Sequence, residues 1–138
     1  MRRFVYEVLE EVSKAEDKES KISILKQNET WALKDIIKGS MDPRVQWHLP
    51  PGEVPYKPCD PHNAPTNLVR QNTKFTYFAK GGKGEQLPQF KRERVFLSII
   101  ESIHPEDAKL MVDMINKKTP KGVTKAVIQE AFPGLIGE

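Results

Sequence analysis

The chain has 138 residues, of which 38% are hydrophobic and 30% are charged, and its formal net charge is +3. This length favours one domain with one hydrophobic core, and no apolar run approaches the ~20 residues that a membrane-spanning helix needs. The single cysteine, Cys59, excludes an internal disulfide and a cysteine-rich zinc site, and the acidic residues that follow Arg3 argue against a signal peptide, so we expect an intracellular protein.

The first helix is indicated by apolar spacing at the N-terminus. Val5, Val8, Leu9 and Val12 fall at i, i+3, i+4 and i+7, which predicts an amphipathic helix over residues 2–14. The intervening positions are mostly charged, as expected for the outer face of a bundle helix.

A second and a third helix are expected before residue 40. The second is short, and Ser20 is its candidate cap. The third begins at Asn28 or Thr30 and ends at Gly39. Its inward face is expected to consist of Trp31 or Ala32 together with Leu33, Ile36 and Ile37.

Proline dominates the chain after Gly39. Residues 42–68 cannot form a regular helix or a central strand, because proline lacks a backbone N–H and fixes φ. Large apolar side chains recur in this stretch, so we interpret it as an ordered irregular segment that covers the helices. These side chains are Val45, Trp47, Leu49, Val54 and Tyr56.

The proline-rich stretch continues into two pieces without a clear helical pattern. The sequence TKFTYFA (73–79) is expected to be a short extended piece, and KGGKGE (80–85) a flexible tip. The irregular insertion is therefore expected to span about residues 42–88. A loop of this length inside one domain is usually functional.

Helical spacing returns in the last third of the chain. An apolar stripe predicts one helix after the basic turn KRER, and Pro105 with two acidic residues after it marks the start of the next. A last helix is expected from Val123 to Ala131. The stripe consists of Val95, Phe96, Ile99, Ile100 and Ile103. We therefore predict an all-α, single-domain helical bundle over residues 1–138, with a long proline-rich irregular segment between two helical halves.

Motifs of known catalytic chemistry are largely missing. The glycines and lysine of GGKGEQ have neither the spacing of a phosphate-binding loop nor a buried strand before them. His48 and His62 flank Cys59, but no pair of ligands has zinc spacing. We expect no catalytic residues, no metal site, no cofactor and no enzyme activity.

Positive charge gathers where the last helix begins. Residues 109–125 contain five lysines and one acidic residue, Asp113. A helix N-terminus offers unpaired amides and a partial positive charge, and Gly122 and Thr124 stand beside it. Two interpretations remain open: a phosphate-binding corner, or a simple capped turn. The lysines around this corner are Lys117, Lys118, Lys121 and Lys125.

Three stretches of the chain follow one another in a recognisable order: ISILKQNETWALKDII (22–37), QWHLPPGEVPYKP (46–58) and VDMINKKTPKGVTKAVIQEAFPGLI (112–136). In this order they resemble the N-terminal α-helical DNA-binding domain of phage ATP-dependent DNA ligases. The resemblance is spread over most of the chain, is strongest at the two ends, and leaves residues 59–87 without a counterpart. The Lys-x-Asp-Gly motif, whose lysine carries the adenylate in these ligases, is missing, so the resemblance does not extend to ligation.

The resemblance implies which residues would contact DNA. By position, Gly122, Val123, Thr124 and Lys125 would contact phosphates, with Lys121 and Lys118 nearby and Lys117 in the same basic turn. The turn from Asp42 to Val45 is a second candidate, with Arg44 as its cation.

The leading hypothesis is a non-catalytic phage protein in the host cytoplasm. It would bind duplex or nicked DNA through phosphates, without sequence preference, in replication or repair. The alternative is a protein-interaction adaptor, docking on a replication or transcription component such as a sliding clamp, or a virion component of the same fold. That alternative would use exposed side chains of the proline-rich segment, among them Trp47 and Tyr56.

Overall fold

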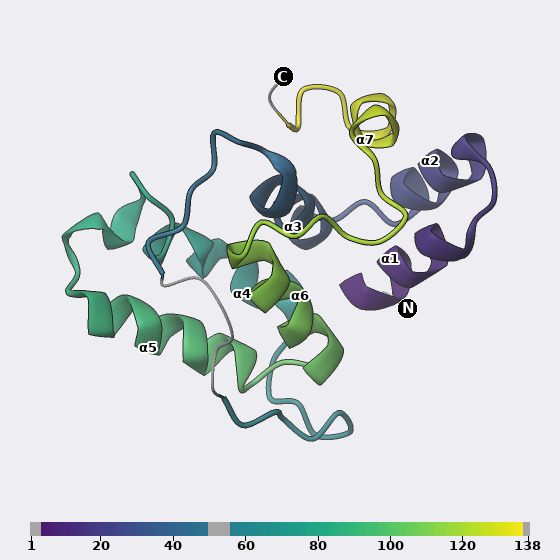
Figure 1. The fold of residues 1–138 in the computed structure, drawn as a ribbon. Helices are drawn as coiled ribbons and strands as arrows, with labels where there is room; N and C mark the ends of the chain where they lie inside the picture. The colour runs from purple at the N-terminus through teal and green to yellow at the C-terminus, as the bar shows by residue number, and fades with distance from the viewer. Residues whose placement is uncertain (1–3, 50–55, 137–138) are drawn as a thin grey trace.

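The computed structural model describes residues 4–49 and 56–136, and this part of the chain is all-helical (Figure 1). It contains seven α-helices and two short 3₁₀ helices, η1 and η2. Within these ranges no strand forms, and the nearest approach to one is an isolated bridge between Trp47 and Ala79. The predicted all-α class is therefore confirmed.

The first three helices follow the apolar spacing closely. They are α1 (Val5–Lys14), α2 (Lys18–Gln27) and α3 (Trp31–Met41). The cap of α2 is Asp17 rather than Ser20, because the Asp17 carboxylate accepts the Ser20 amide at 3.2 Å. Thr30 caps α3 by accepting the Leu33 amide at 3.1 Å, which selects one of the two predicted starts.

The end of α3 differs from the prediction. Gly39 does not stop the helix, which continues to Met41. A Cβ at Gly39 would lie 2.5 Å from the Trp47 ring and 2.7 Å from the Met114 sulfur. The glycine is therefore needed for close packing against the helix surface, and it does not terminate the helix.

The middle of the chain is more helical than predicted. Residues 68–86 contain α4 (Leu68–Gln71), η1 (Asn72–Tyr77) and η2 (Lys83–Gln86). The prediction of one irregular segment that continues to residue 88 was therefore wrong. Among the described residues of this region, 42–49, 56–67, 78–82 and 87–88 lie outside helices, in turns, bends, bridge residues or irregular backbone.

The two pieces predicted as irregular in this region are helical turns. The expected extended piece is largely η1, because Phe75 and Phe78, three residues apart, both turn into the core. The expected flexible tip is the compact turn of η2. A Cβ at Gly84 would overlap the Tyr77 carbonyl, and the Glu85 carboxylate accepts the Gly81 amide at 2.7 Å.

The last three helices are α5 (Gln89–Ile100), α6 (Pro105–Ile115) and α7 (Lys125–Ala131). Pro105 occupies the first turn of α6, as predicted. The start of α7 is two residues later than predicted, because Thr124 is its cap and Val123 precedes it.

One hydrophobic core connects all seven α-helices. α6 packs against α1, α3 and α5, and α7 packs against α2, so the last helix of the chain lies against the second one (Figure 1). The largest fully buried side chains include Leu25, Ile36, Phe78, Phe96 and Met111. Burial of each such side chain stabilises the fold by about 1.5–3 kcal/mol. No helix in the described ranges is long and apolar enough to cross a membrane.

Candidate nucleic-acid interface

The turn before α7 packs tightly against the first two helices. Gly122 has a φ of +79°, and a Cβ there would lie 2.6 Å from Cα of Ser13 at the end of α1. Its carbonyl accepts a hydrogen bond from Nζ of Lys21 in α2, at 2.8 Å. Both the conformation and the close approach require glycine, so Gly122 is explained by packing.

The next two residues of the predicted corner also serve the fold. Val123 is buried, with 5% of its surface exposed. The Thr124 hydroxyl accepts the Val127 amide at 3.3 Å and so caps α7. The capped-turn interpretation therefore accounts for Gly122, Val123 and Thr124.

Lys117 is turned away from the corner. It adopts a left-handed backbone conformation with a φ of 57°, and its Nζ donates to the carbonyl oxygens of Gly39 (2.8 Å), Asp42 (2.8 Å) and Val45 (2.9 Å). Burial lowers the pKa of this ammonium, and the nearby Asp42 carboxylate opposes that shift. Lys117 caps the C-terminal end of α3, so its prediction as a phosphate contact is corrected.

Arg44 is engaged by a carboxylate. Its Nε lies 3.1 Å from Oδ1 and its Nη2 lies 3.0 Å from Oδ2 of Asp42, whose side chain is fully buried. The hydrogen bonds to Asp42, followed by its charge, raise the pKa of Arg44. This bidentate pair neutralises Arg44 at the end of α3 that Lys117 caps, whereas Gly122 lies against α1 and α2. The structure thus divides the predicted cations between two places.

Three lysines remain free at the corner. Lys118, Lys121 and Lys125 are exposed and have no ion-pair partner among the residues that the structure describes. Lys118 and Lys121 line a groove of about 700 Å³ between α1, α6 and the α6–α7 loop. Acidic side chains line the same groove: Glu10, Glu106 and Asp113. Lys109 lines it as well, so the groove carries charges of both signs, and phosphate contacts are favoured only beside its lysines.

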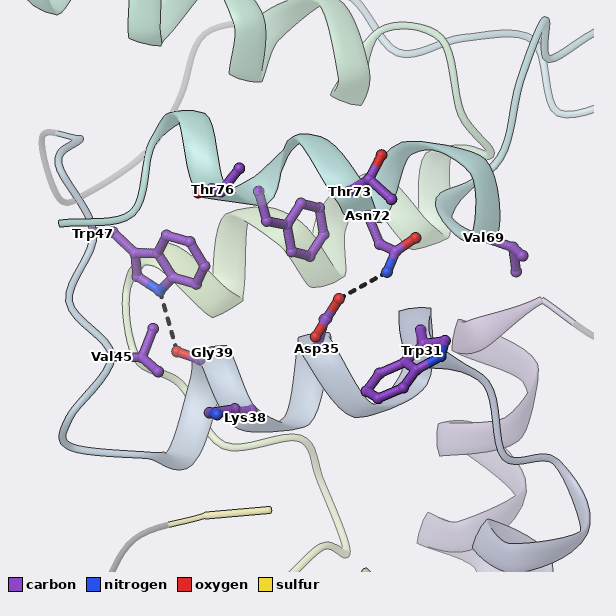
Figure 2. A pocket seen from close by; sticks show the side chains of 11 residues that line it. Trp31, Asp35, Lys38, Gly39, Val45, Trp47, Val69, Asn72, Thr73 and Thr76 are labelled. Atoms are coloured by element: carbon purple, nitrogen blue, oxygen red, sulfur yellow. Dashed lines mark hydrogen bonds between the residues drawn. The ribbon is translucent and has the colours of Figure 1, made fainter. Parts of the chain in front are cut away.

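A second groove, of about 580 Å³, lies between α3 and the α4–η1 segment (Figure 2). Trp31, Asp35 and Lys38 line it from α3, at i, i+4 and i+7 of one helix face. The opposite wall is lined by Val69, Asn72, Thr73, Phe75 and Thr76. The sequence analysis did not identify this groove.

Trp31 stands exposed at one end of this groove. It exposes 72% of its surface, whereas Ala32 beside it is fully buried, which settles the two alternatives for the inward face of α3. Nζ of Lys34 lies 4.9 Å from the Trp31 ring centroid and 2.9 Å from Oε1 of Glu29. The exposure of Trp31 could have been predicted from the sequence. If the buried face of α3 runs from Ala32 to Ile37, helical geometry places Trp31 on the outer face.

Asp35 is the half-buried polar group of the groove. Nδ2 of Asn72 donates to its Oδ2 at 2.7 Å, and Figure 2 shows the carboxylate pointing from α3 toward the opposite wall. Burial raises the pKa of Asp35, while the bond from Asn72 and the charge of Lys38 oppose this shift.

The side chains on which the adaptor alternative depended are folded onto the helices. The Trp47 indole donates from Nε1 to the Gly39 carbonyl at 3.1 Å and packs against Phe75 and Phe78. Leu49 and Tyr56 are partly buried against the core. Val54 lies outside the described residues. The described part of this segment therefore offers no exposed aromatic surface.

Residues 8–121 match a family of unknown function, DUF6433. The chain belongs to this family. The DUF6433 match covers α3, α4 and η1 in full, and hence every residue that lines the groove of Trp31, but it ends before α7. No curated protein matches the chain. In the described ranges no group of three or more His, Cys, Asp or Glu side chains is placed to hold a metal ion.

Proposed function

We propose that this protein is a non-catalytic DNA-binding protein that needs no cofactor. It holds duplex or nicked DNA by the phosphate backbone, without reading the base sequence, in replication or repair. The contact residues are fewer than the resemblance to phage DNA ligases implied: they are Lys118, Lys121 and Lys125.

The observation that carries the proposal is the group of exposed lysines in the α6–α7 turn and at the start of α7, which have no ion-pair partner among the described residues. Lys118, Lys121 and Lys125 flank Gly122, which is held against the ends of α1 and α2 by Lys21 and by its close approach to Ser13. A turn fixed in this way presents its charges at little cost in backbone entropy. Exposed ammonium groups attract phosphates by releasing counterions from the polyanion.

A salt titration tests the proposal. Fluorescence anisotropy with intact duplex, nicked duplex and unrelated duplex sequences should give similar affinities for all sequences. The logarithm of the association constant should fall linearly with the logarithm of salt concentration, at about 0.9 per phosphate contacted. Lys121→Glu combined with Lys125→Glu should weaken binding uniformly and lower that slope.

A charge-matched variant provides the control. Lys80→Glu combined with Lys91→Glu changes two exposed lysines elsewhere, and each double variant takes the formal net charge from +3 to −1, since two substitutions remove four units. Equal loss of affinity in both variants would mean that only net charge matters, which would contradict a site at the α6–α7 turn. Unchanged affinity in the first variant would contradict it as well.

A further inference from the structure

The groove between α3 and η1 combines one exposed aromatic ring with charges of both signs. Trp31 and Trp47 lie at its opposite ends, with Asp35 between them (Figure 2). Trp47 is tied down by its hydrogen bond to Gly39 and by its packing on Phe75 and Phe78. Nζ of Lys34 lies beside the Trp31 ring, which exposes 72% of its surface and is accessible to a ligand.

We propose that this groove binds an unpaired nucleobase of a nucleic-acid strand, stacked on Trp31. The inference rests on the proposed function in one respect, because both take nucleic acid as the ligand. It adds a site for a single-stranded segment to the backbone contacts at the α6–α7 turn.

The arrangement of charge favours a nucleotide as the occupant. Lys38 lines the groove two helical turns from Trp31, where it can reach a phosphate that flanks a stacked base, whereas Lys34 beside the Trp31 ring is ion-paired with Glu29 at 2.9 Å. An aromatic ring beside cationic side chains is the combination that binds single strands without sequence preference.

Asp35 gives the floor of the groove a role in holding the base. Its Oδ2 accepts from Asn72, and its Oδ1 has no hydrogen-bond partner among the described residues. An amino or imino group of a base can donate to this oxygen. Thr73 and Thr76 line the same wall, and the Thr76 hydroxyl already accepts the Lys83 amide at 3.0 Å.

A cationic peptide side chain is the competing occupant, since Asp35 and Trp31 by themselves suit an ammonium group. Lys38 lines the same groove, and Lys34 already lies 4.9 Å from the Trp31 ring. A further cation would be repelled by Lys38, which has no ion-pair partner among the described residues, and one side of the Trp31 ring is already taken by Lys34. The charges therefore favour a ligand with a neutral ring and an anionic backbone.

The intrinsic fluorescence of Trp31 provides the test. The chain has two tryptophans, so Trp31→Phe leaves only the packed Trp47 as fluorophore while keeping an aromatic ring for stacking. We expect a single-stranded oligonucleotide of mixed sequence to quench the wild-type protein. In Trp31→Phe the quenching should be lost while the affinity, followed by anisotropy, is largely kept.

Removal of the ring should weaken binding itself. Trp31→Ala should lower the affinity for the single-stranded oligonucleotide by roughly 5- to 100-fold, as expected for the stacking of one base. Phe90→Ala is the matched control, because Phe90 is an exposed aromatic residue on α5 that does not line the groove. Circular dichroism of each variant should show an unchanged helix content.

Three results would overturn the inference. One is a wild-type protein that the single strand does not quench. Another is equal quenching by heparin, a polyanion without bases. The third is quenching by tetralysine and not by the oligonucleotide, which would identify a site for a cation of a protein partner. None of these depends on duplex binding, which the charge reversal of Lys121 and Lys125 tests separately.

Discussion

Nζ of Lys117 donates to the carbonyl oxygen of Gly39 at 2.8 Å, and these two residues are 78 positions apart in the chain. The same ammonium reaches the carbonyls of Asp42 and Val45. A helix ends with several unpaired carbonyls, and a positive charge there also complements the helix dipole. Lys117 thus joins the end of α6 to the end of α3.

Replacing Lys117 should destabilise the fold. We expect Lys117→Met to lower the free energy of unfolding by about 1–3 kcal/mol, because three carbonyls lose a charged donor. Urea denaturation followed by circular dichroism measures this. Lys118→Met, the exposed neighbour, should change the free energy of unfolding by less than about 0.5 kcal/mol. An equally small effect of Lys117→Met would show that water replaces the ammonium at no cost.

The glycine of the α6–α7 turn gives a second prediction. Gly122→Ala should destabilise by at least about 1–2 kcal/mol, because alanine is strained at positive φ and its Cβ would meet the backbone of Ser13. Gly81→Ala is the matched control: its φ is +81° and nothing lies within 4 Å of the added Cβ. The difference in melting temperature between the two variants isolates the steric contact with α1. An equal decrease in melting temperature in the two variants would mean that the positive φ, and not the contact with Ser13, is what requires glycine at position 122.

Asp107 makes stability depend on pH. Its Oδ1 accepts the Tyr6 amide at 2.9 Å, and burial raises its pKa to about 7, opposed by that bond and assisted by Glu7 and Glu106. The pKa of Asp107 is higher in the folded protein than in the unfolded chain, so the proton binds the folded state more tightly. Its contribution to the free energy of unfolding is complete below about pH 4 and is lost as pH rises through 7.

Asp107→Asn should therefore be more stable than the wild-type protein at pH 8, by roughly 1–3 kcal/mol, with a smaller difference at pH 5. Chemical denaturation at both pH values measures this difference. Asp113→Asn, an exposed carboxyl change on the same helix, should show no such trend. A difference that does not grow with pH would mean that Asp107 is ionised in the folded protein at both pH values.

Arg92 holds the turn of η2 in place. Its buried guanidinium donates to the carbonyls of Gly84 (3.2 Å), His48 and Leu87. Arg92→Met should lower the free energy of unfolding by roughly 2–4 kcal/mol, since buried carbonyls would lose their donor. Hydrogen exchange should show faster opening of residues 83–87 than in Arg94→Met, which alters an exposed residue two positions along α5. Unchanged exchange would mean that backbone bonds alone hold the turn.

Much of the helical architecture follows from the sequence by itself. The spacing of Val5, Val8, Leu9 and Val12 defined the buried face of α1, and Thr30 and Pro105 marked helix starts. These signals are local: burial of one face repeats every 3.6 residues, and a cap lies within three residues of the amide that it satisfies. The sequence therefore determined the all-α class and the approximate bounds of most helices.

Only the tertiary structure decided which of the basic residues stay free and where a groove opens. Lys117 and Lys121 belong to the same basic stretch of the sequence. In the fold, however, Lys117 donates hydrogen bonds to carbonyls of α3 and of the turn after it, whereas Lys121 faces solvent. Gly39 resembled a helix stop and proved to be a packing site for Trp47 and Met114. In each case the partner is distant in the chain, and local spacing carries no information about a contact that the packing of whole helices creates.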